Sequence, residues 1–381
     1  MTFLGNDYMG IKVLQVFASL DMGGAECRMM DVYRFVDKDQ IQFDFVTLQD
    51  GTQYFENEIE SLGGKVIKIP SPRKVGVRNH ISALRECMRS GGYNAVHAHT
   101  SYHCGIVMFA ANKEGIPVRI THARTNDSIQ RDIKTKAYIA FGRALINRYS
   151  TNKLAISEAS GRFVFGHNNF EIVPNSIDLD LYKNICEDEI NDVRREFNLS
   201  VEQTVIGHVG RFDRFKNQRF VIDVFQDYLK TNPHSRLVLI GDGELKQELQ
   251  QYAKELNIDR EIIFTGVRSD IPVWMNLFDV LMFPSVIEGL GGVVLEAQAA
   301  GTPAVISDNV PDSVDVGLDL IKRCSLEANK SLWINEINDS LEKPKINQEL
   351  IQKRFDESGY SLVASSKRYI DIYKGKAIDG R

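Results

Sequence analysis

Short runs of apolar residues alternate with longer segments of helical periodicity along the whole chain. This alternation is typical of βαβ units stacked around parallel sheets. In the first half we expect strands at 11–17, 43–48, 65–69, 95–98, 118–121 and 154–156. The clearest helical patterns between them lie at 25–36, 77–90 and 134–148.

The alternation stops near Ile172-Val173-Pro174-Asn175, where Pro174 favours an extended backbone. A polar, acidic stretch follows to about residue 202, and a second α/β series then begins. Its strands are expected at 205–209, 236–240, 262–265, 280–283 and 304–306. We therefore predict one α/β domain over residues 1–175 and a second over 176–356.

A chain of 381 residues is long for a single hydrophobic core, so two domains agree with its length. Two doubly wound, Rossmann-like domains in series would face each other across an interdomain cleft. In such sheets, ligands bind beyond the carboxyl ends of the strands. The loops that follow strands are therefore where functional residues are expected.

The composition excludes several classes of protein. The net charge is −5, whereas a nucleic-acid-binding protein needs a strongly basic face. No apolar run is long enough to span a bilayer, and no signal peptide is visible, so we expect a cytoplasmic protein. Five scattered cysteines without a CxxC pair indicate reduced thiols rather than a disulfide framework or a zinc site.

Three loops that follow predicted strands carry candidate chemistry. After the first strand, Gly23 and Gly24 precede a helix, where backbone amides and the helix dipole can hold an anion. A tight turn without a ligand is the alternative, and the dinucleotide fingerprint GxGxxG is absent. In the second half, Arg211 and Lys216 lie on one loop and can grip both phosphates of a diphosphate. Their charge would also stabilise a departing nucleoside diphosphate.

The third loop runs from Glu288 through Gly291 and Gly292 to a helical segment that contains Glu296. If the segment were helical throughout, the two carboxylates would lie about two turns apart on one face. The glycines favour a loop position for Glu288 and a helical one for Glu296. Glu296 has apolar neighbours, where a carboxylate needs a partner such as a ribose diol. A capping Glu288 and a surface Glu296 are the structural alternative.

Together these motifs resemble the retaining glycosyltransferase family 4, which has the GT-B fold of two facing Rossmann-like domains. The resemblance covers the chain from Ile11 to about Tyr373, and the carboxylate pair is its strongest motif. The motifs occur in the order Gly23-Gly24-Ala25-Glu26, Gly210-Arg211 with Lys216, Gly241-Asp242-Gly243-Glu244, and Glu288 to Glu296 followed by Gly301-Thr302-Pro303.

The resemblance implies a role for each matching residue. Gly23 and Gly24 would lie against the donor phosphates, and Arg211 and Lys216 would bind the diphosphate as the leaving group. Glu288 would contact hydroxyls of the transferred sugar, and Glu296 those of the ribose. The amides of Leu290, Gly291, Gly292 and Val293 would lie near the phosphates. Asn175, Ser176 and Asp178 match the hinge-side segment of the family, and the final helix, over 357–381, would return to the first domain.

Histidines gather near the ends of the fourth and fifth strands, namely His97, His99, His103 and His122. His122 matches the family's histidine near the anomeric carbon of the donor sugar, and a buried core histidine is the alternative. Three histidines together could hold a metal ion. No carboxylate joins them, however, and the GT-B class needs no metal, so we expect neither a metal nor another cofactor.

The segment from Arg119 to Lys153 has eight Lys and Arg residues against two Asp, within a chain of net negative charge. Aromatic residues lie among the cations near Lys134, Lys136 and Arg143. This pattern suggests the hypothesis of a peripheral contact with an anionic membrane surface, on the inner face of the cell membrane, and with a lipid-linked acceptor. A solvated amphipathic helix is the alternative.

The expected function is transfer of a hexose from a nucleoside-diphosphate sugar to a hydroxyl of a growing glycan, with retained anomeric configuration and front-face departure and attack. The nucleotide is expected to be UDP, with GDP as the alternative, and the setting is capsule or exopolysaccharide synthesis. Three other functions stay open: a nucleotide-sugar epimerase on the same fold, a non-catalytic sugar- or nucleotide-binding module, and an NAD-dependent oxidoreductase.

Overall fold

The polypeptide folds into two α/β units, each built on its own parallel sheet. The computed structural model describes residues 10–124 and 133–375. The first unit comprises the residues up to Ser176 together with those from Leu362 onward, and the second comprises Ile177–Ser361. Two α/β domains with parallel sheets were expected, and that architecture is confirmed.

The strands of the first unit form one sheet with the order β3-β2-β1-β4-β5-β6-β7. Its strands are β1 (Ile11–Val16), β2 (Ile41–Thr47), β3 (Val66–Lys68), β4 (Ala95–Ala98), β5 (Val118–Ala123), β6 (Asn152–Ala155) and β7 (Glu171–Ile172). Its helices are α1 (Gly24–Phe35), α2 (Glu56–Ser61), α3 (Pro72–Val75), α4 (Val77–Gly91), η1 (Ser101–His103), α5 (Cys104–Lys113), α6 (Ile133–Tyr149), α7 (Glu158–Phe165) and α16 (Leu362–Tyr373).

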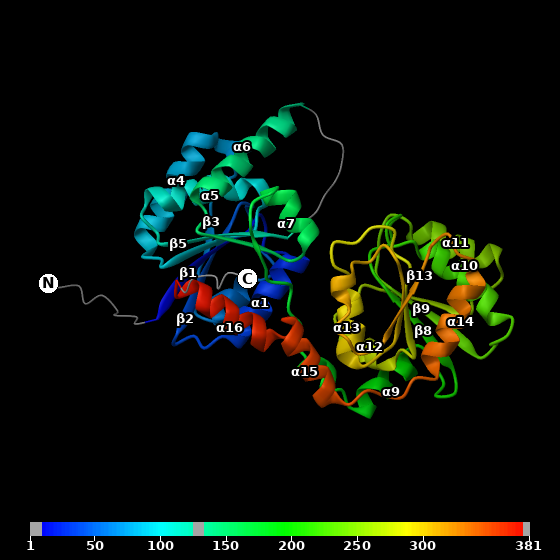
Figure 1. Cartoon of the computed structure of the whole chain (residues 1–381). Helices are drawn as coiled ribbons and strands as arrows, with labels where there is room; N and C mark the ends of the chain where they lie inside the picture. The colour runs from blue at the N-terminus through cyan, green and yellow to red at the C-terminus, as the bar shows by residue number, and fades with distance from the viewer. Residues whose placement is uncertain (1–9, 125–132, 376–381) are drawn as a thin grey trace. The chain divides into compact units, whose positions relative to one another are not determined.

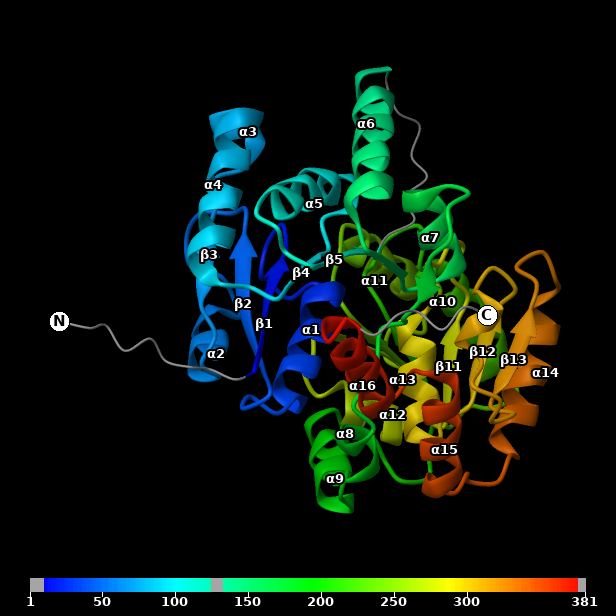
Figure 2. The same ribbon diagram turned by 60° about the vertical axis from the view of Figure 1, so that its left-hand side comes forward.

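Buried side chains on both faces of these strands explain the two helical layers. Along β1, Val13 packs in one hydrophobic cluster and the next residue, Leu14, packs in another. The Val13 cluster includes side chains of α1 and α16, and the Leu14 cluster includes side chains of α4, α5 and α7. Helices α1 and α16 lie side by side although they come from opposite ends of the chain (Figures 1 and 2).

The second unit repeats the plan with the strand order β10-β9-β8-β11-β12-β13. Its strands are β8 (Thr204–Val209), β9 (Ser235–Ile240), β10 (Ile262–Gly266), β11 (Val280–Phe283), β12 (Ala304–Ser307) and β13 (Ile321–Cys324). Its helices are α8 (Asp180–Lys183), α9 (Glu187–Glu196), α10 (Gln218–Leu229), α11 (Lys246–Glu255), α12 (Ile271–Leu277), α13 (Gly292–Ala300), η2 (Asp312–Val314), α14 (Lys330–Leu341) and α15 (Gln348–Ser358). Trp274 of α12 and Trp333 of α14 are fully buried in its two hydrophobic clusters.

The chain passes between the units twice, at Ser176–Ile177 and at Ser361–Leu362. The two passages are joined by a hydrogen bond of 2.8 Å from the Ile177 amide to the Tyr360 carbonyl oxygen. The predicted boundary at 356/357 falls inside α15, which ends at Ser358.

In each sheet the direction of winding reverses once, between β1 and β4 in the first unit and between β8 and β11 in the second. Such a switch point leaves a crevice at the carboxyl ends of the two neighbouring strands, where ligands of this fold class bind. The loops after these four strands therefore position the candidate sites. Among the described residues, no helix is both long and apolar enough to cross a bilayer.

Candidate active site

The loop after β8 is held against the loop after β9 by backbone contacts. The Gly210 amide donates to the Ile240 carbonyl oxygen (3.0 Å), and the Phe212 amide donates to that of Asp242 (2.9 Å). Gly241 has φ +141°, and a Cβ there would lie 2.0 Å from the Gly210 carbonyl oxygen. Only glycine fits this approach. Phe212 is fully buried, whereas the neighbouring Arg211 side chain is 79% exposed.

Buried polar groups lie beneath Arg211. The Nδ1 of His208 donates to the Met282 carbonyl oxygen at 3.0 Å, so its Nε2 accepts from the Gln218 amide at 3.2 Å. The same amide nitrogen donates to the Arg211 carbonyl oxygen at 2.8 Å. Burial lowers the His208 pKa to about 4, which keeps the imidazole neutral. Sequence reasoning missed this support because nothing distinguishes His208 from any strand histidine.

Lys216 and Glu288 meet although 72 positions separate them in the sequence. The Lys216 ammonium forms an ion pair with the Glu288 carboxylate and lies 4.8 Å from the centre of the Phe283 ring. The Ser285 hydroxyl donates to the same carboxylate at 2.7 Å. Lys216 is placed by Asp213, whose carboxylate accepts from the Lys216 amide at 3.1 Å. Glu288 is 10% exposed, so this partly desolvated ion pair is held in a fixed geometry.

The amino end of α13 is open. Gly291 precedes the helix at the N-cap position with φ +88°, and no side chain caps the helix. Gly292 is exposed, and no atom lies within 4 Å of where its Cβ would be. Leu290, 6% exposed, anchors the loop in the core, and Val293 lies in the first helical turn. Uncapped amides and the positive end of the helix dipole suit a phosphate group.

The structure decides between the two arrangements considered for the carboxylate pair. Glu288 lies on the loop, and Glu296 lies inside α13, where it is partly exposed between buried Leu295 and Ala297. The loops after β8 and β11 thus bring Arg211, Lys216 and Glu288 to the switch point. A continuous helix from Glu288 is wrong because Gly291 takes a left-handed conformation.

A hollow of about 370 Å³ opens at the carboxyl ends of β8, β9 and β10. Aliphatic side chains and glycine backbone form most of its wall, which suits a flat heterocycle. Arg268 at its rim is held by Asp270 and Glu196. Its lining consists of Val209, Gly210, Arg211, Ile240, Gly241, Asp242, Val267, Arg268 and Ile271. The residues after β10 were not predicted, although their position after a strand was a usable signal.

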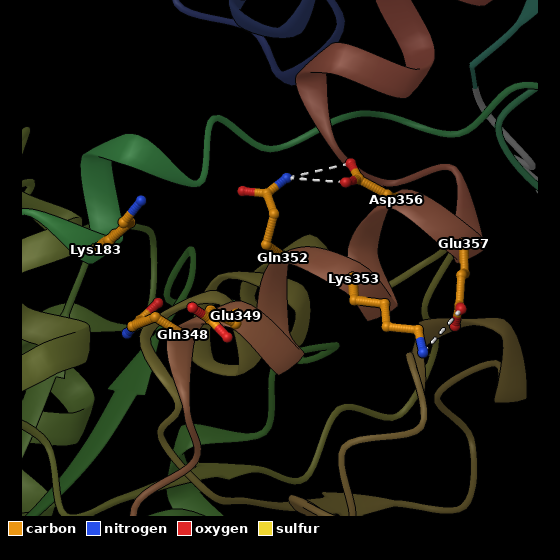
Figure 3. A pocket seen from close by; sticks show the side chains of 7 residues that line it. All are labelled: Lys183, Gln348, Glu349, Gln352, Lys353, Asp356 and Glu357. Carbon is orange, nitrogen blue, oxygen red and sulfur yellow. Dashed lines mark hydrogen bonds and ion pairs between the residues drawn. The ribbon is translucent and has the colours of Figure 1, made fainter.

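A second hollow of the same unit, of about 580 Å³, lies over α15 and Lys183 (Figure 3). Its charged groups pair along the helix: Gln352 donates to Asp356 at 3.2 Å, and Lys353 lies 3.9 Å from Glu357. None of the predicted site residues lines it, and its position on a helix away from the strand ends argues against a catalytic role.

In the first unit, the paired glycines lie where α1 begins. Gly23 precedes the helix without a side-chain cap, and Gly24 is its first residue. The Glu26 carboxylate folds back over this end. Its position is seen from Gly23, where an added Cβ would lie 2.2 Å from a Glu26 carboxylate oxygen. Burial raises the Glu26 pKa, an effect partly offset by its own amide and by the charge of Arg124.

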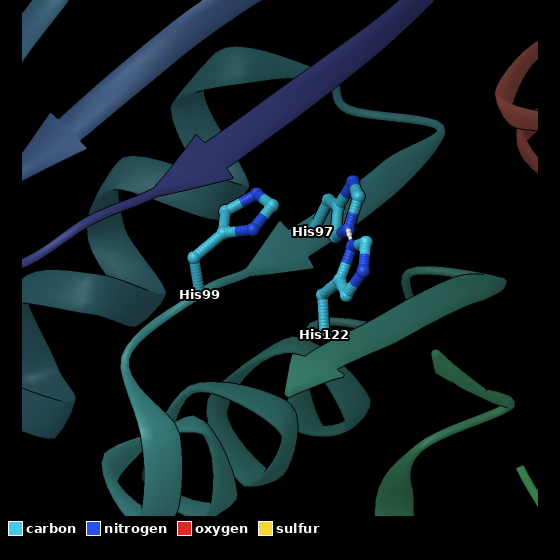
Figure 4. Close-up of side chains that lie close together, drawn as sticks. All are labelled: His97, His99 and His122. Carbon is cyan, nitrogen blue, oxygen red and sulfur yellow. Dashed lines mark hydrogen bonds between the residues drawn. The ribbon is translucent and has the colours of Figure 1, made fainter. Parts of the chain in front are cut away.

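His97, His99 and His122 form the histidine group at the ends of β4 and β5 (Figure 4). The expectation that His103 joins them is wrong: on η1, His103 instead faces His80 of α4, with 2.9 Å between their Nε2 atoms. Burial lowers the pKa of His97, His99 and His122 well below the ordinary value, and the nearby Arg124 charge adds to this.

The hydrogen bonds of the histidine group have one consistent direction. Because the His122 Nε2 faces the Val173 carbonyl oxygen at 3.1 Å, it donates, and the His122 Nδ1 accepts from His97 at 3.2 Å. The His97 Nδ1 then accepts from the Tyr373 hydroxyl at 2.8 Å. Tyr373 in turn accepts from the Gln15 amide at 3.0 Å.

The same series continues to Arg124. The Gln15 carbonyl accepts from the His99 Nε2 at 3.0 Å, and the His99 Nδ1 accepts from the Arg124 Nε at 3.1 Å. Each of the six ring nitrogens therefore has a protein partner, and neutral imidazoles satisfy every bond. A metal ion would have to displace these bonds, so the chemistry of the group favours a hydrogen-bonded chain. His122 is fully buried, and its predicted contact with the donor sugar stays a prediction.

Among the described residues of the segment 119–153, two of the arginines bind backbone and do not contribute to a free basic face. Arg119 donates to the carbonyl oxygens of Tyr149 and Ile116. Arg143 donates to those of Phe163 and Val164. Both guanidinium groups therefore bind backbone carbonyl oxygens. On α6, Tyr138 (45% exposed) and Phe141 (55% exposed) lie about one turn apart, and Lys136 is exposed on another side of the helix. Residues 125–132, including Arg131, and the Lys134 side chain lie outside the described part of the structure.

Comparison with known proteins identifies the family. Residues 22–181 match the family described as Glycosyltransferase Family 4, and residues 189–355 match the family described as Glycosyl transferases group 1. The chain is 34% identical to EpsF of Bacillus subtilis, a protein whose name assigns it to the glycosyltransferases, over 95% of this chain and 96% of that protein. The chain belongs to the group 1 glycosyltransferases.

Other relatives of this glycosyltransferase have more specific names. It is 25% identical to CapH of Staphylococcus aureus, named as a capsular polysaccharide biosynthesis glycosyltransferase, over 97% of this chain and all of that protein. An Escherichia coli relative, 22% identical over 78% of this chain and 79% of that protein, is named UDP-Gal:alpha-D-GlcNAc-diphosphoundecaprenol alpha-1,3-galactosyltransferase.

Solved structures agree on the fold. HepE of Anabaena, in complex with UDP and glucose, is 20% identical and superposes with a TM-score of 0.75 over 96% of this chain and all of that one. The fold class is GT-B, as the sequence motifs predicted. The matched family segments contain every predicted site residue, from Gly23 to Glu296.

Proposed function

We propose that this glycosyltransferase moves a hexose from UDP-hexose to a hydroxyl group of a lipid-linked glycan during capsule or exopolysaccharide synthesis. The observation that carries the proposal is the group at the switch point of the second unit. There, exposed Arg211, the Lys216–Glu288 ion pair and the uncapped amino end of α13 lie on the loops that follow β8 and β11.

This group fits the chemistry of sugar transfer. Arg211, Lys216 and the α13 amides would hold the diphosphate and stabilise the charge that develops as the nucleotide departs. Glu288, oriented by Ser285 and Lys216, would accept hydrogen bonds from hydroxyls of the transferred sugar. The nucleobase would occupy the hollow beside Val267, with the ribose on Glu296.

Support for UDP and for a lipid-linked acceptor comes from relatives. HepE was solved with UDP and with UDP-glucose, and the name of the Escherichia coli relative specifies UDP-galactose and a diphosphoundecaprenol-linked acceptor. We propose transfer with retained anomeric configuration and without a metal ion. Because His122 has no exposed atom and both its ring nitrogens are bonded, its role would be to position neighbouring groups.

A peripheral membrane contact would serve a lipid-linked acceptor. The support is that Tyr138 and Phe141 lie about one turn apart on α6 with exposed rings, on a helix that also carries cations, a combination that suits an anionic interface. Replacing Tyr138 and Phe141 with Ser should release the protein from anionic vesicles in co-sedimentation. Unchanged sedimentation would contradict the contact without affecting the proposed reaction.

The deciding experiment measures thermal stabilisation by UDP, GDP, ADP and NAD, for the wild type and for Glu296→Gln. A ligand at about 100 times its dissociation constant adds roughly 2.7 kcal/mol of stability, a shift of a few degrees. We expect UDP to stabilise the wild type and to lose most of that effect in the variant. A response to NAD alone, or to no nucleotide, would overturn the proposal.

The product then separates transfer from epimerisation. With UDP-hexose and a lipid-linked acceptor, NMR of the product should show an α-linked sugar from an α-linked donor. Conversion of the donor sugar without any acceptor would identify an epimerase instead.

A further inference from the structure

The guanidinium group of Arg124 is held on two sides by neutral partners. Its Nε donates to His99 at 3.1 Å, and its Nη1 donates to the Asn175 side-chain oxygen at 2.5 Å. His99 is itself fixed by Gln15 and stacks on the Phe17 ring at 4.2 Å. The plane and direction of the guanidinium are thereby set before any ligand arrives.

The third nitrogen of Arg124, Nη2, has no hydrogen-bond partner and is shielded from solvent, although the residue as a whole is partly exposed. Among the described residues, no carboxylate lies within ion-pair distance of Arg124. The Tyr369 hydroxyl is a further neutral group within hydrogen-bonding reach of the Arg124 side chain. Within the described part of the chain, this fixed and shielded cation therefore has no ion-pair partner, which is uncommon because an unmade hydrogen bond to a charged group costs stability.

Arg124 lies at the edge of the sheet where ligands of this fold class bind. It directly follows β5, His99 directly follows β4, and Phe17 directly follows β1, so all three are at the carboxyl ends of strands at or next to the switch point. The open Gly23–Gly24 start of α1 follows the same β1 strand, and the Arg124 charge reaches Glu26 there.

A purely structural role would not require this arginine. His99 and Asn175 need only one neutral donor each, which an amide side chain could supply without burying a charge. The guanidinium adds a permanent positive charge and a third, unused donor direction. Both additions point to an anionic oxygen.

We infer that Arg124 is a substrate-binding residue of the first unit that binds a phosphate oxygen. This inference rests on the proposed function, which supplies two phosphate-bearing substrates. The phosphate belongs either to the nucleotide donor or to the lipid diphosphate of the acceptor. His99 and Asn175 are the positioning residues that orient the guanidinium.

The test compares the wild type with Arg124→Gln and Arg124→Lys, using UDP and geranyl diphosphate as probes in calorimetric titrations. Arg148→Gln is the matched control, because Arg148 is an exposed arginine of the same unit that stacks on Tyr149. Losing a charged hydrogen bond should weaken binding of one probe or both by about tenfold to hundredfold. Arg124→Lys should weaken it less, and Arg148→Gln should leave it unchanged.

Each result has one meaning. A loss for UDP alone assigns the donor phosphate, a loss for geranyl diphosphate alone assigns the acceptor phosphate, and losses for both assign a shared position. A lower melting temperature with unchanged affinities would overturn the inference and leave a structural arginine. If Arg124→Gln does not fold, Asn175→Ala, which frees the guanidinium, decides the same question.

The experiment also separates this inference from the proposed function. A wild type that does not bind UDP contradicts the proposed donor, whereas the geranyl diphosphate arm still tests Arg124. Failure of both probes to bind the wild type would overturn the inference as well.

Discussion

At the scale of single residues, the Lys216–Glu288 ion pair lies at the centre of the candidate site of the second unit. Lys216 and Glu288 come from loops at the ends of two neighbouring strands. The Ser285 hydroxyl donates a second hydrogen bond to the Glu288 carboxylate and so fixes its position. In the proposed arrangement, Glu288 would have two tasks: to balance the charge of Lys216 and to present a carboxylate to the sugar.

Removing the charge of Glu288 should abolish transfer while sparing nucleotide binding. In Glu288→Gln, the Lys216 ammonium loses its counter-ion, and the sugar loses a charged acceptor, so we expect transfer to fall by about 100-fold or more. UDP affinity, measured by calorimetry, should change little, because Glu288 does not face the nucleotide in the proposed arrangement.

The matched control is Glu248→Gln, which removes an exposed pair with Arg219 at 3.5 Å. A surface pair of this kind contributes about 1 kcal/mol or less. Equal losses of activity in both variants would show that the effect of Glu288→Gln is not specific to the site.

The sequence predicted that Arg211, Lys216 and Glu288 gather at the switch point of the second unit, but not that Lys216 pairs with Glu288. Arg211, Lys216 and Glu288 follow strands, and strand ends converge by topology alone. The direction of a side chain depends on loop conformation, and for this reason His103 turns to His80 and not to His97. Within the cationic segment, the sequence did not indicate that Arg119 and Arg143 bind nearby carbonyl oxygens.

At the scale of elements, the periodic segments were predicted well and the weakly patterned ones were not. The strand at 95–98 and the helix at 77–90 have clear apolar periodicity and appear within a residue of their predicted bounds as β4 and α4. β7 has only two residues, and β13 (Ile-Lys-Arg-Cys) lies at a sheet edge with polar side chains, so neither carries a pattern.

Helix α9 illustrates another source of missed structure. The stretch after Asn175 was interpreted as a polar break, yet it contains α8 and α9. Three acidic residues in the first turn of α9 and two arginines in its last turn complement the helix dipole. The apolar stripe is short, with Val193 buried and Ile190 packed against the same cluster, so the acidic composition hid the helix from sequence periodicity.

The loop that carries Arg211 should depend on one glycine. Gly241→Ala would place a methyl group 2.0 Å from the Gly210 carbonyl oxygen, at φ +141°. We expect a loss of more than about 2 kcal/mol in the free energy of unfolding, measured by urea denaturation, and weaker UDP binding because the Arg211 loop must move.

Gly266→Ala separates steric contact from backbone strain. Gly266 also has positive φ, +76°, but no atom lies within 4 Å of its Cβ position. The left-handed conformation alone costs about 1 kcal/mol. Similar losses in the two variants would mean that the contact between the loops after β8 and β9 is not essential.

At the scale of the whole molecule, the two units differ in how many neutral histidines they bury. In the described part of the first unit, His80, His97, His99, His103 and His122 all have lowered pKa values, with that of His103 at about 4. In the second unit, His208 has a pKa of about 4. The stability of the first unit should therefore depend more strongly on pH than that of the second.

Acidification should destabilise the first unit before the second. Below about pH 6.5 the histidines of the unfolded chain bind protons that the folded chain does not. Each such group lowers the free energy of unfolding by about 1.4 kcal/mol per pH unit, until the pH falls to its folded pKa. Stability is thus fully present above pH 6.5 and declines as the pH falls toward 4.

The two tryptophans allow the units to be followed separately. Trp274 and Trp333 both lie in the second unit, so tryptophan fluorescence reports that unit, whereas circular dichroism reports both. Between pH 7 and pH 5, we expect the dichroism transition to move to lower temperature ahead of the fluorescence transition. Parallel movement of the two transitions would contradict the prediction.

The return of α16 to the first unit has a consequence for how the protein is made. The first unit begins before the second along the chain, yet Tyr369, Ile372 and Tyr373 of its core come after the last residue of the second unit. Domains usually fold in the order in which they are synthesised. Here the second unit is complete when Ser361 emerges, whereas the first must wait, with Tyr33 and Phe43 uncovered, until α16 has emerged as well.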